Sequence, residues 1–196
     1  QASLGSYDNV GGAGFTDTGF DVTSLSDGWH RLTVSAGDGS ATFYVDGVSV
    51  GGHTTVSNSD FFAVGNYQGG NQQWGYLAGF KIYDGTNVPE QLPQLPGPPE
   101  LIVSVGVDEN GEIVFGGTAE YSGSITGGPS IVEGPSGLQD GILFGGGSDS
   151  VLLGDGVDTD SAWTIDCYFM TPIPGTGAWH TLTRGAAGDH QVIIHP

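Results

Sequence analysis

Short runs of alternating apolar and polar residues recur along the chain, and this period of two predicts β-strands. In the clearest run, residues 74–83, the alternation places on one predicted face Trp74, Tyr76, Ala78, Phe80 and Ile82. A second run, residues 28–51, predicts a three-stranded meander with turns at Asp38-Gly39 and Asp46-Gly47. Asp-Gly between β-forming residues favours a type I′ hairpin turn, which needs positive φ at both central residues.

Further short strands are predicted on both sides of this meander. Asn110-Gly111 predicts one more I′-type hairpin, between residues 101–107 and 112–115. No convincing amphipathic helix is found, and no apolar run approaches the roughly 18 residues of a membrane span. The pattern therefore predicts an all-β chain folded as an antiparallel β-sandwich. The other predicted strands are residues 4–7, 15–22, 61–64, 141–144, 150–153, 162–170, 181–184 and 190–194.

Proline divides the chain. Residues 88–99 contain five of the ten prolines, which predicts an extended, semi-rigid linker. The expected units are residues 1–87 and 100–196, and a length of 196 residues suits one large sandwich or two small domains.

Two motifs precede the linker. One is the strand Gly28-Trp29-His30-Arg31 followed by Phe-Tyr-Val-Asp-Gly at residues 43–47. The other is residues 74–83, preceded by Val-Gly-Asn at residues 64–66. Both resemble motifs of laminin G-like (concanavalin A-like lectin) domains. The resemblance implies a jelly-roll sandwich but says little about function, because this fold hosts lectins, adhesion modules, glycosidases and spacers.

The two halves follow the family pattern in reversed order. Residues 138–151 and 162–169 resemble stretches that open a laminin G-like domain, so a late half (residues 1–84) precedes an early half (residues 118–196). The chain is then a circular permutant, a unit completed between neighbouring subunits or repeats, or a pair of modules that do not pair. The last arrangement leaves strand edges unpaired. We expect a self-assembling, filament-like unit, with the permutant as the alternative.

The charge of the chain argues against nucleic acids and anionic membranes as partners. The chain has 22 acidic and three basic residues, a net charge of −19, whereas proteins bind nucleic acids and anionic membranes through clusters of Lys and Arg. Sixteen of the acids are Asp, which favours turns and hard cations, or simply solubility in a salty or calcium-rich medium. The single cysteine, Cys167, excludes an internal disulfide and is expected to be buried and inert. Because the sequence starts at Gln1 with no signal peptide, we interpret it as a processed or excised extracellular or cell-surface product.

The resemblance implies calcium as a cofactor, because laminin G-like domains often hold Ca²⁺ at one rim through loop carboxylates and carbonyls. The candidate ligands are Asp8, Asn9, Asp17 and Asp60. The alternative is that these side chains cap turns in solvent.

Carbohydrate is the other candidate ligand. Aromatic faces stack on sugar rings and amides bond to hydroxyl groups. Both kinds of side chain gather before the strand at residues 74–83, where the candidates are Tyr67, Gln68, Asn71, Gln72 and Trp74.

Catalysis is poorly supported. The chain has no His-Glu-x-x-His, Cys-x-x-Cys or P-loop motif, and Glu109 and Glu112 do not match the Glu-x-Asp-x-x-Glu of glycosidases with this fold. We therefore predict a non-enzymatic structural or adhesive module whose partners are copies of itself. The alternative is a calcium-dependent, carbohydrate-binding lectin module.

Overall fold

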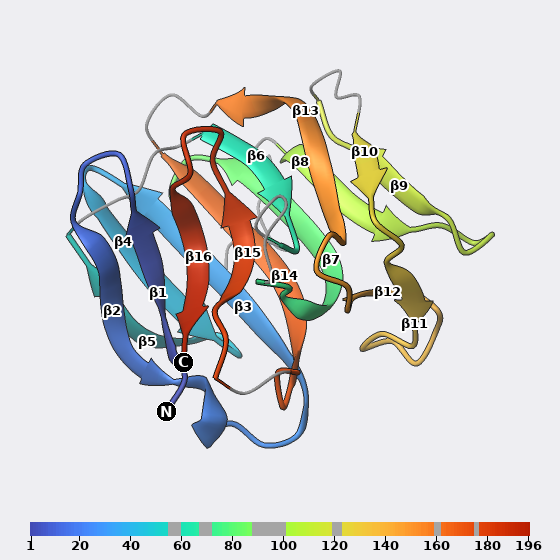
Figure 1. Ribbon diagram of the computed structural model, residues 1–196, viewed down its shortest axis with the longest axis horizontal. Coiled ribbons are helices and arrows are strands. Elements are labelled where there is room, and N and C mark those ends of the chain that lie inside the picture. The colour runs from blue at the N-terminus through green and yellow to red at the C-terminus, as the bar shows by residue number, and fades with distance from the viewer. Residues whose placement is uncertain (55–59, 67–71, 88–100, 119–122, 159–161, 175–176) are drawn as a thin grey trace.

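The structure is a computed structural model that describes residues 1–54, 60–66, 72–87, 101–118, 123–158, 162–174 and 177–196. Two antiparallel sheets pack face to face, with one short 3₁₀ helix, η1 (Val22–Ser24), beside them (Figure 1). The predicted all-β antiparallel sandwich is confirmed.

Among the described residues, the first sheet has seven strands. Their order is β10 (Ser124–Thr126), β13 (Ser150–Asp158), β6 (Asp60–Val64), β15 (His180–Arg184), β16 (His190–His195), β1 (Ser3–Asp8) and β2 (Gly14–Asp21).

The second sheet has nine strands in the same part of the chain. Seven follow the order β11 (Ser130–Val132), β12 (Gly141–Phe144), β7 (Gly75–Asp84), β14 (Trp163–Thr171), β3 (Gly28–Gly37), β4 (Ser40–Val45) and β5 (Val48–His53). The hairpin of β8 (Leu101–Val107) and β9 (Ile113–Gly116) adds to β7 beyond the part that pairs with β12.

Both sheets contain strands from the two halves of the chain, paired with one another. β14 lies between β3 and β7, with Asp166 opposite both Thr33 and Lys81. β1 pairs with β16, with Ser3 opposite His195, so the two ends of the chain lie side by side (Figure 1). In this structure strands from both halves of one chain therefore complete the two sheets together. The predicted linker at residues 88–99 lies outside the described residues.

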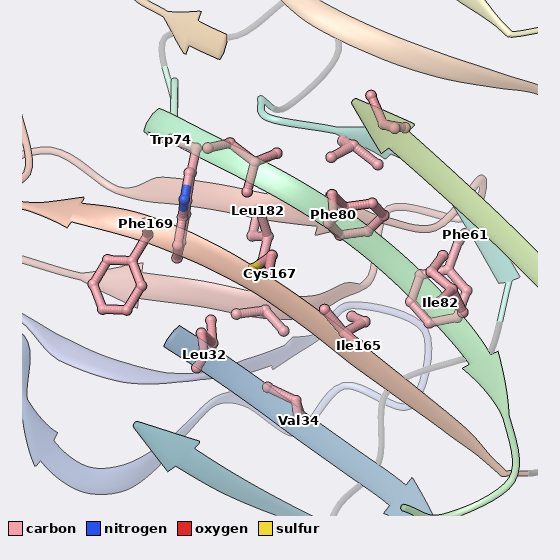
Figure 2. Close-up of a cluster of buried hydrophobic side chains, with 14 of the residues drawn as sticks. Leu32, Val34, Phe61, Trp74, Phe80, Ile82, Ile165, Cys167, Phe169 and Leu182 are labelled. Carbon is pink, nitrogen blue, oxygen red and sulfur yellow. The ribbon is translucent and has the colours of Figure 1, made fainter. Parts of the chain in front are cut away.

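The core follows the alternation of the strands. In β14, every second side chain from Trp163 to Phe169 faces the opposite sheet, where Figure 2 shows this set meeting residues such as Phe61 and Leu182. Cys167 is part of this core, and burial raises the pKa of its thiol well above the ordinary value. The thiol is therefore protonated and inert, as expected.

A bulge in β7 changes one predicted face. Gly79 has a φ of +56°, and the pairing with β14 shifts register at this point. The extra residue moves Leu77, Phe80 and Ile82 into the core, whereas Tyr76 is only partly buried. The single face predicted for residues 74–82 was therefore wrong at Tyr76 and Ala78, because Ala78 pairs with Tyr168 whereas Leu77 pairs with the core residue Phe169.

Two of the three predicted hairpin turns have the expected geometry. Asp38-Gly39 and Asp46-Gly47 have positive φ at both positions, between 51° and 81°, and each forms a two-residue loop. The turn around Asn110-Gly111 differs, because Val107 pairs with Ile113 and leaves five residues between them. The Asp108 carboxylate holds this wider loop by accepting from the backbone N–H groups of Asn110 and Glu112, both at 2.9 Å.

Candidate functional site

A groove of about 340 Å³ lies on the outer face of the seven-stranded sheet. Val192 and Ile194 point into the core, so the alternation of β16 turns Ile193 towards this outer face. The groove joins segments far apart in the sequence, and its lining residues are Tyr7, Asn9, Gln72, Trp179, His190 and Ile193.

Aromatic rings form one side of the groove. The Trp179 ring lies edge-to-face against three rings, those of Tyr7, Phe15 and His195, with centroid distances of 5.5, 5.6 and 4.2 Å. Phe15 also stacks on His195 at 4.9 Å. These four residues, which we call the aromatic wall, hold one another in place by preferred ring geometries.

A polar network forms the floor of the groove. Thr181 Oγ1 donates to Gln72 Oε1 at 2.8 Å, and His190 Nδ1 lies 3.2 Å from the same hydroxyl oxygen. Thr181 is fully buried and His190 is 4% exposed. The backbone fixes Gln72, because Thr181 N donates to Gln72 O at 2.9 Å and Gln72 N donates to Asn66 Oδ1 at 3.1 Å.

The lining of the groove is uncharged at neutral pH. Burial, reinforced by the positive charge of Arg184, lowers the pKa of His190 to about 4, and Asp189 opposes this shift only in part. The imidazole is therefore neutral at pH 7, and the other lining side chains carry no charge. In a chain with a net charge of −19, the groove is a local neutral surface.

The side chains predicted to bind calcium each contact a backbone group. Asp8 and Asp17 accept from Gly11 N and Gly19 N, while Asp60 accepts from Ala186 N at 3.0 Å. The Asn9 amide donates to the carbonyl of Gly188. In the described ranges, no three His, Cys, Asp or Glu side chains are placed to hold a metal ion. Asp8 and Asp17 thus cap the turns that follow them, as in the turn-capping alternative, whereas Asp60 and Asn9 bond to backbone groups distant in the sequence.

The predicted carbohydrate site is divided. Tyr67, Gln68 and Asn71 lie outside the described residues, and Gln72 lines the groove. Trp74 is 1% exposed and packs in the core with its ring centroid 6.0 Å from that of Phe169 (Figure 2), so its ring has no face open to a sugar.

Several residues of the groove were not predicted. Tyr7 lines it from β1, Trp179 from the segment before β15, and His190 from β16, while Thr181 of β15 lies buried beside Gln72 and His190. The available signal was the alternation around Leu182, a core residue, which turns Thr181 and Trp179 to the opposite face.

A second pocket, of about 410 Å³, lies where η1 meets the ends of β14 and β16, and it is mainly apolar. Two of its polar side chains already have partners: Thr171 Oγ1 donates to Ser26 O, and His180 Nδ1 lies 2.7 Å from Gln73 O. This pocket offers apolar shape but few hydrogen-bonding groups for a ligand, so the groove is the stronger candidate.

Residues 47–51 match the Gly-x-Ser-x-Gly pattern of hydrolase nucleophile elbows. Ser49 lies in β5, opposite Tyr44, and not in a turn between a strand and a helix. The pentapeptide is therefore an edge strand, and its match to the motif is no sign of catalysis.

Comparison of the chain with known protein families, curated proteins and solved structures finds no match. The laminin G-like resemblance thus depends on the motifs quoted above. In the described part of the chain, no helix is long and apolar enough to cross a membrane.

Proposed function

We propose that this chain is a non-enzymatic adhesive β-sandwich module that binds carbohydrate in the groove of the seven-stranded sheet. The observation that carries the proposal is the meeting of the aromatic wall with the amide side chains of Asn9 and Gln72. A ring face and neutral hydrogen-bonding groups are what a sugar requires, because each sugar ring has an apolar face and a rim of hydroxyl groups.

The charge of the groove indicates which sugars it takes. Its lining is uncharged, whereas the chain as a whole repels anions at a net charge of −19. We therefore expect neutral sugars to bind in preference to sulfated or uronic ones. A volume of about 340 Å³ is small for a ligand site, which favours a ligand of about one or two sugar rings.

The test is titration calorimetry with neutral mono- and disaccharides chosen from a glycan array. We expect Trp179→Ala to weaken binding about tenfold or more, because the partly exposed ring that would contact the sugar is removed. Trp29→Ala is the matched control, since Trp29 packs edge-on to Tyr76 in the other sheet. A chelator should leave affinity unchanged. Failure of every neutral sugar to bind, or loss of binding in the control alone, would contradict the proposal.

A self-assembling structural unit is the second candidate. It is favoured by the pairing of β1 with β16, because the same ladder formed between two chains would build a strand-exchanged assembly. Light scattering at about 0.15 M salt, where charge repulsion is screened within about 8 Å, separates the two candidates. A species of 20.1 kDa indicates closure within one chain, and large extended species indicate exchange.

A further inference from the structure

The floor of the groove brings together a hydroxyl, an imidazole and a carboxamide. Thr181 Oγ1 is 2.8 Å from Gln72 Oε1 and 3.2 Å from His190 Nδ1. These are the parts of an acyl-transfer site: a nucleophile, a base within hydrogen-bond reach, and a carbonyl to attack. The acyl group here belongs to the same chain.

We propose that Thr181 and Gln72 form an intramolecular ester bond, with His190 as the base that activates the hydroxyl. Thr181 Oγ1 attacks Gln72 Cδ while its proton passes to His190 Nδ1, and the carbonyl electrons move onto Oε1. The tetrahedral carbon then re-forms the carbonyl as the Cδ–Nε2 bond breaks, and the imidazolium returns the proton to the departing nitrogen. The products are one ester and one ammonia, with no change in oxidation state.

The hydrogen bonds of the network allow two arrangements. In one, the Thr181 hydroxyl donates to Gln72 Oε1 and accepts from His190 Nδ1–H. In the other, the amide is turned over so that Nε2–H donates to Thr181 Oγ1, and the hydroxyl donates to an unprotonated Nδ1. The second arrangement is the reactive one, because the proton then already points at the base.

Burial protects the product, and it leaves the imidazole in its unprotonated form. Burial, with Arg184, lowers the pKa of His190 to about 4, so at pH 7 the ring carries no extra proton, and its closeness to the hydroxyl makes it the base. Thr181 is fully buried, which keeps competing water from the nucleophile and protects the ester from hydrolysis. Gln72 and His190 also line the groove, which gives ammonia a path to solvent.

Two backbone contacts hold the reacting groups in register. Thr181 N donates to Gln72 O at 2.9 Å, and Gln72 N donates to Asn66 Oδ1 at 3.1 Å. Alignment of this kind makes an attack between two parts of a chain effectively unimolecular. The bond would tie the segment before β7 to β15, joining residues 109 positions apart in the sequence.

The positions of the basic residues make the test direct. Trypsin cleaves only after Arg31, Lys81 and Arg184, so Gln72 lies in peptide 32–81 and Thr181 in peptide 82–184. We expect the folded wild-type chain, digested under denaturing conditions, to yield these two peptides joined, at their summed mass less about 17 Da for one ammonia. Mild alkali should separate them and leave Glu at position 72. The intact mass is not sufficient, because Gln1 can also lose ammonia by cyclising.

Variants separate the chemistry from simple hydrogen bonding. Thr181→Val and Gln72→Glu should give separate peptides, Thr181→Ser should still give the joined species, and His190→Gln should slow its formation about a hundredfold or more. Thr183→Val is the matched control, because Thr183 is an equally buried threonine of β15 and should leave the joined species unchanged. Separate wild-type peptides at full mass, with native near-ultraviolet circular dichroism before digestion, would overturn the proposal. Joined peptides in Thr181→Val would overturn it as well.

Discussion

His190 should make the stability of the sandwich fall as the pH is lowered below neutrality. Burial, with Arg184, lowers its pKa from 6.5 to about 4 in the folded chain, and Asp189 compensates only in part. Between these two values the unfolded chain binds a proton that the folded chain does not. The free energy of unfolding is therefore unaffected by His190 above about pH 6.5 and decreases as the pH falls towards 4.

The magnitude follows from the difference of 2.5 between the two pKa values. At about 1.4 kcal/mol per unit, His190 destabilises the fold by about 3 kcal/mol near pH 4 and by about 2 kcal/mol at pH 5. The assay is urea unfolding followed by tryptophan fluorescence, for wild type and His190→Gln, at several pH values from 7.5 to 4. Subtracting the unfolding free energy of His190→Gln from that of wild type at each pH removes the contribution of the carboxylates that titrate in both proteins. A constant offset between the proteins, from lost contacts or a lost cross-link, does not affect the change with pH.

His30 provides a control, because its pKa shifts in the opposite direction to that of His190. Burial lowers its pKa, but hydrogen bonds to the Asp46 carboxylate and the Ser26 carbonyl outweigh this effect, so the net shift is upward. A raised pKa stabilises the fold below about pH 6.5, and this stabilisation is lost as the pH rises through the folded value. His30→Gln should therefore lose most stability at acidic pH. A wild-type minus His190→Gln difference that stays flat from pH 7.5 to 5, or rises on acidification, would refute the assignment of His190.

Three substitutions test contacts that stabilise the sandwich, each measured by urea unfolding at pH 7.5. Arg31→Met should lower the free energy of unfolding by about 3 kcal/mol, because it removes two hydrogen bonds of 2.8 and 2.9 Å and leaves the Asp166 carboxylate buried without its cation. An equal decrease in Arg31→Lys, which keeps the positive charge, would show that the loss of the guanidinium fork is responsible. Trp74→Ala should cost about 3–5 kcal/mol, and the milder Trp74→Phe should leave sugar affinity unchanged if the ring serves only the core. Gly65→Ala should cost about 1–3 kcal/mol, because φ is +89° and a Cβ would lie 2.6 Å from the Phe144 ring; a neutral result would mean that this loop relaxes.

Local patterns in the sequence were sufficient to predict the strands and the tightest turns. The alternation in residues 163–169 gives β14 a core face, and Asp38-Gly39 and Asp46-Gly47 supply the positive φ values of two-residue hairpins. These features depend on neighbouring residues alone, because side-chain period and backbone φ are local properties. The same reasoning failed at Gly79, where a bulge set by the partner strand reverses the alternation. It also failed at residues 108–112, where one carboxylate bonds to two backbone N–H groups and widens the loop.

Local sequence patterns could not predict the groove, because its residues become neighbours only after strands distant in sequence pair. Tyr7 meets His190 through the β1–β16 ladder, and Gln72 reaches Thr181 across 109 positions of sequence. Alternation could place Trp74 on a face but could not decide whether that face met the core or the solvent, and the packing of the two sheets buried it. Residue pattern and composition were therefore enough to predict an acidic, all-β sandwich. Which strands of the two halves pair, and which aromatic and polar side chains converge on one face, depends on register and sheet packing, and these arise from contacts between residues distant in sequence.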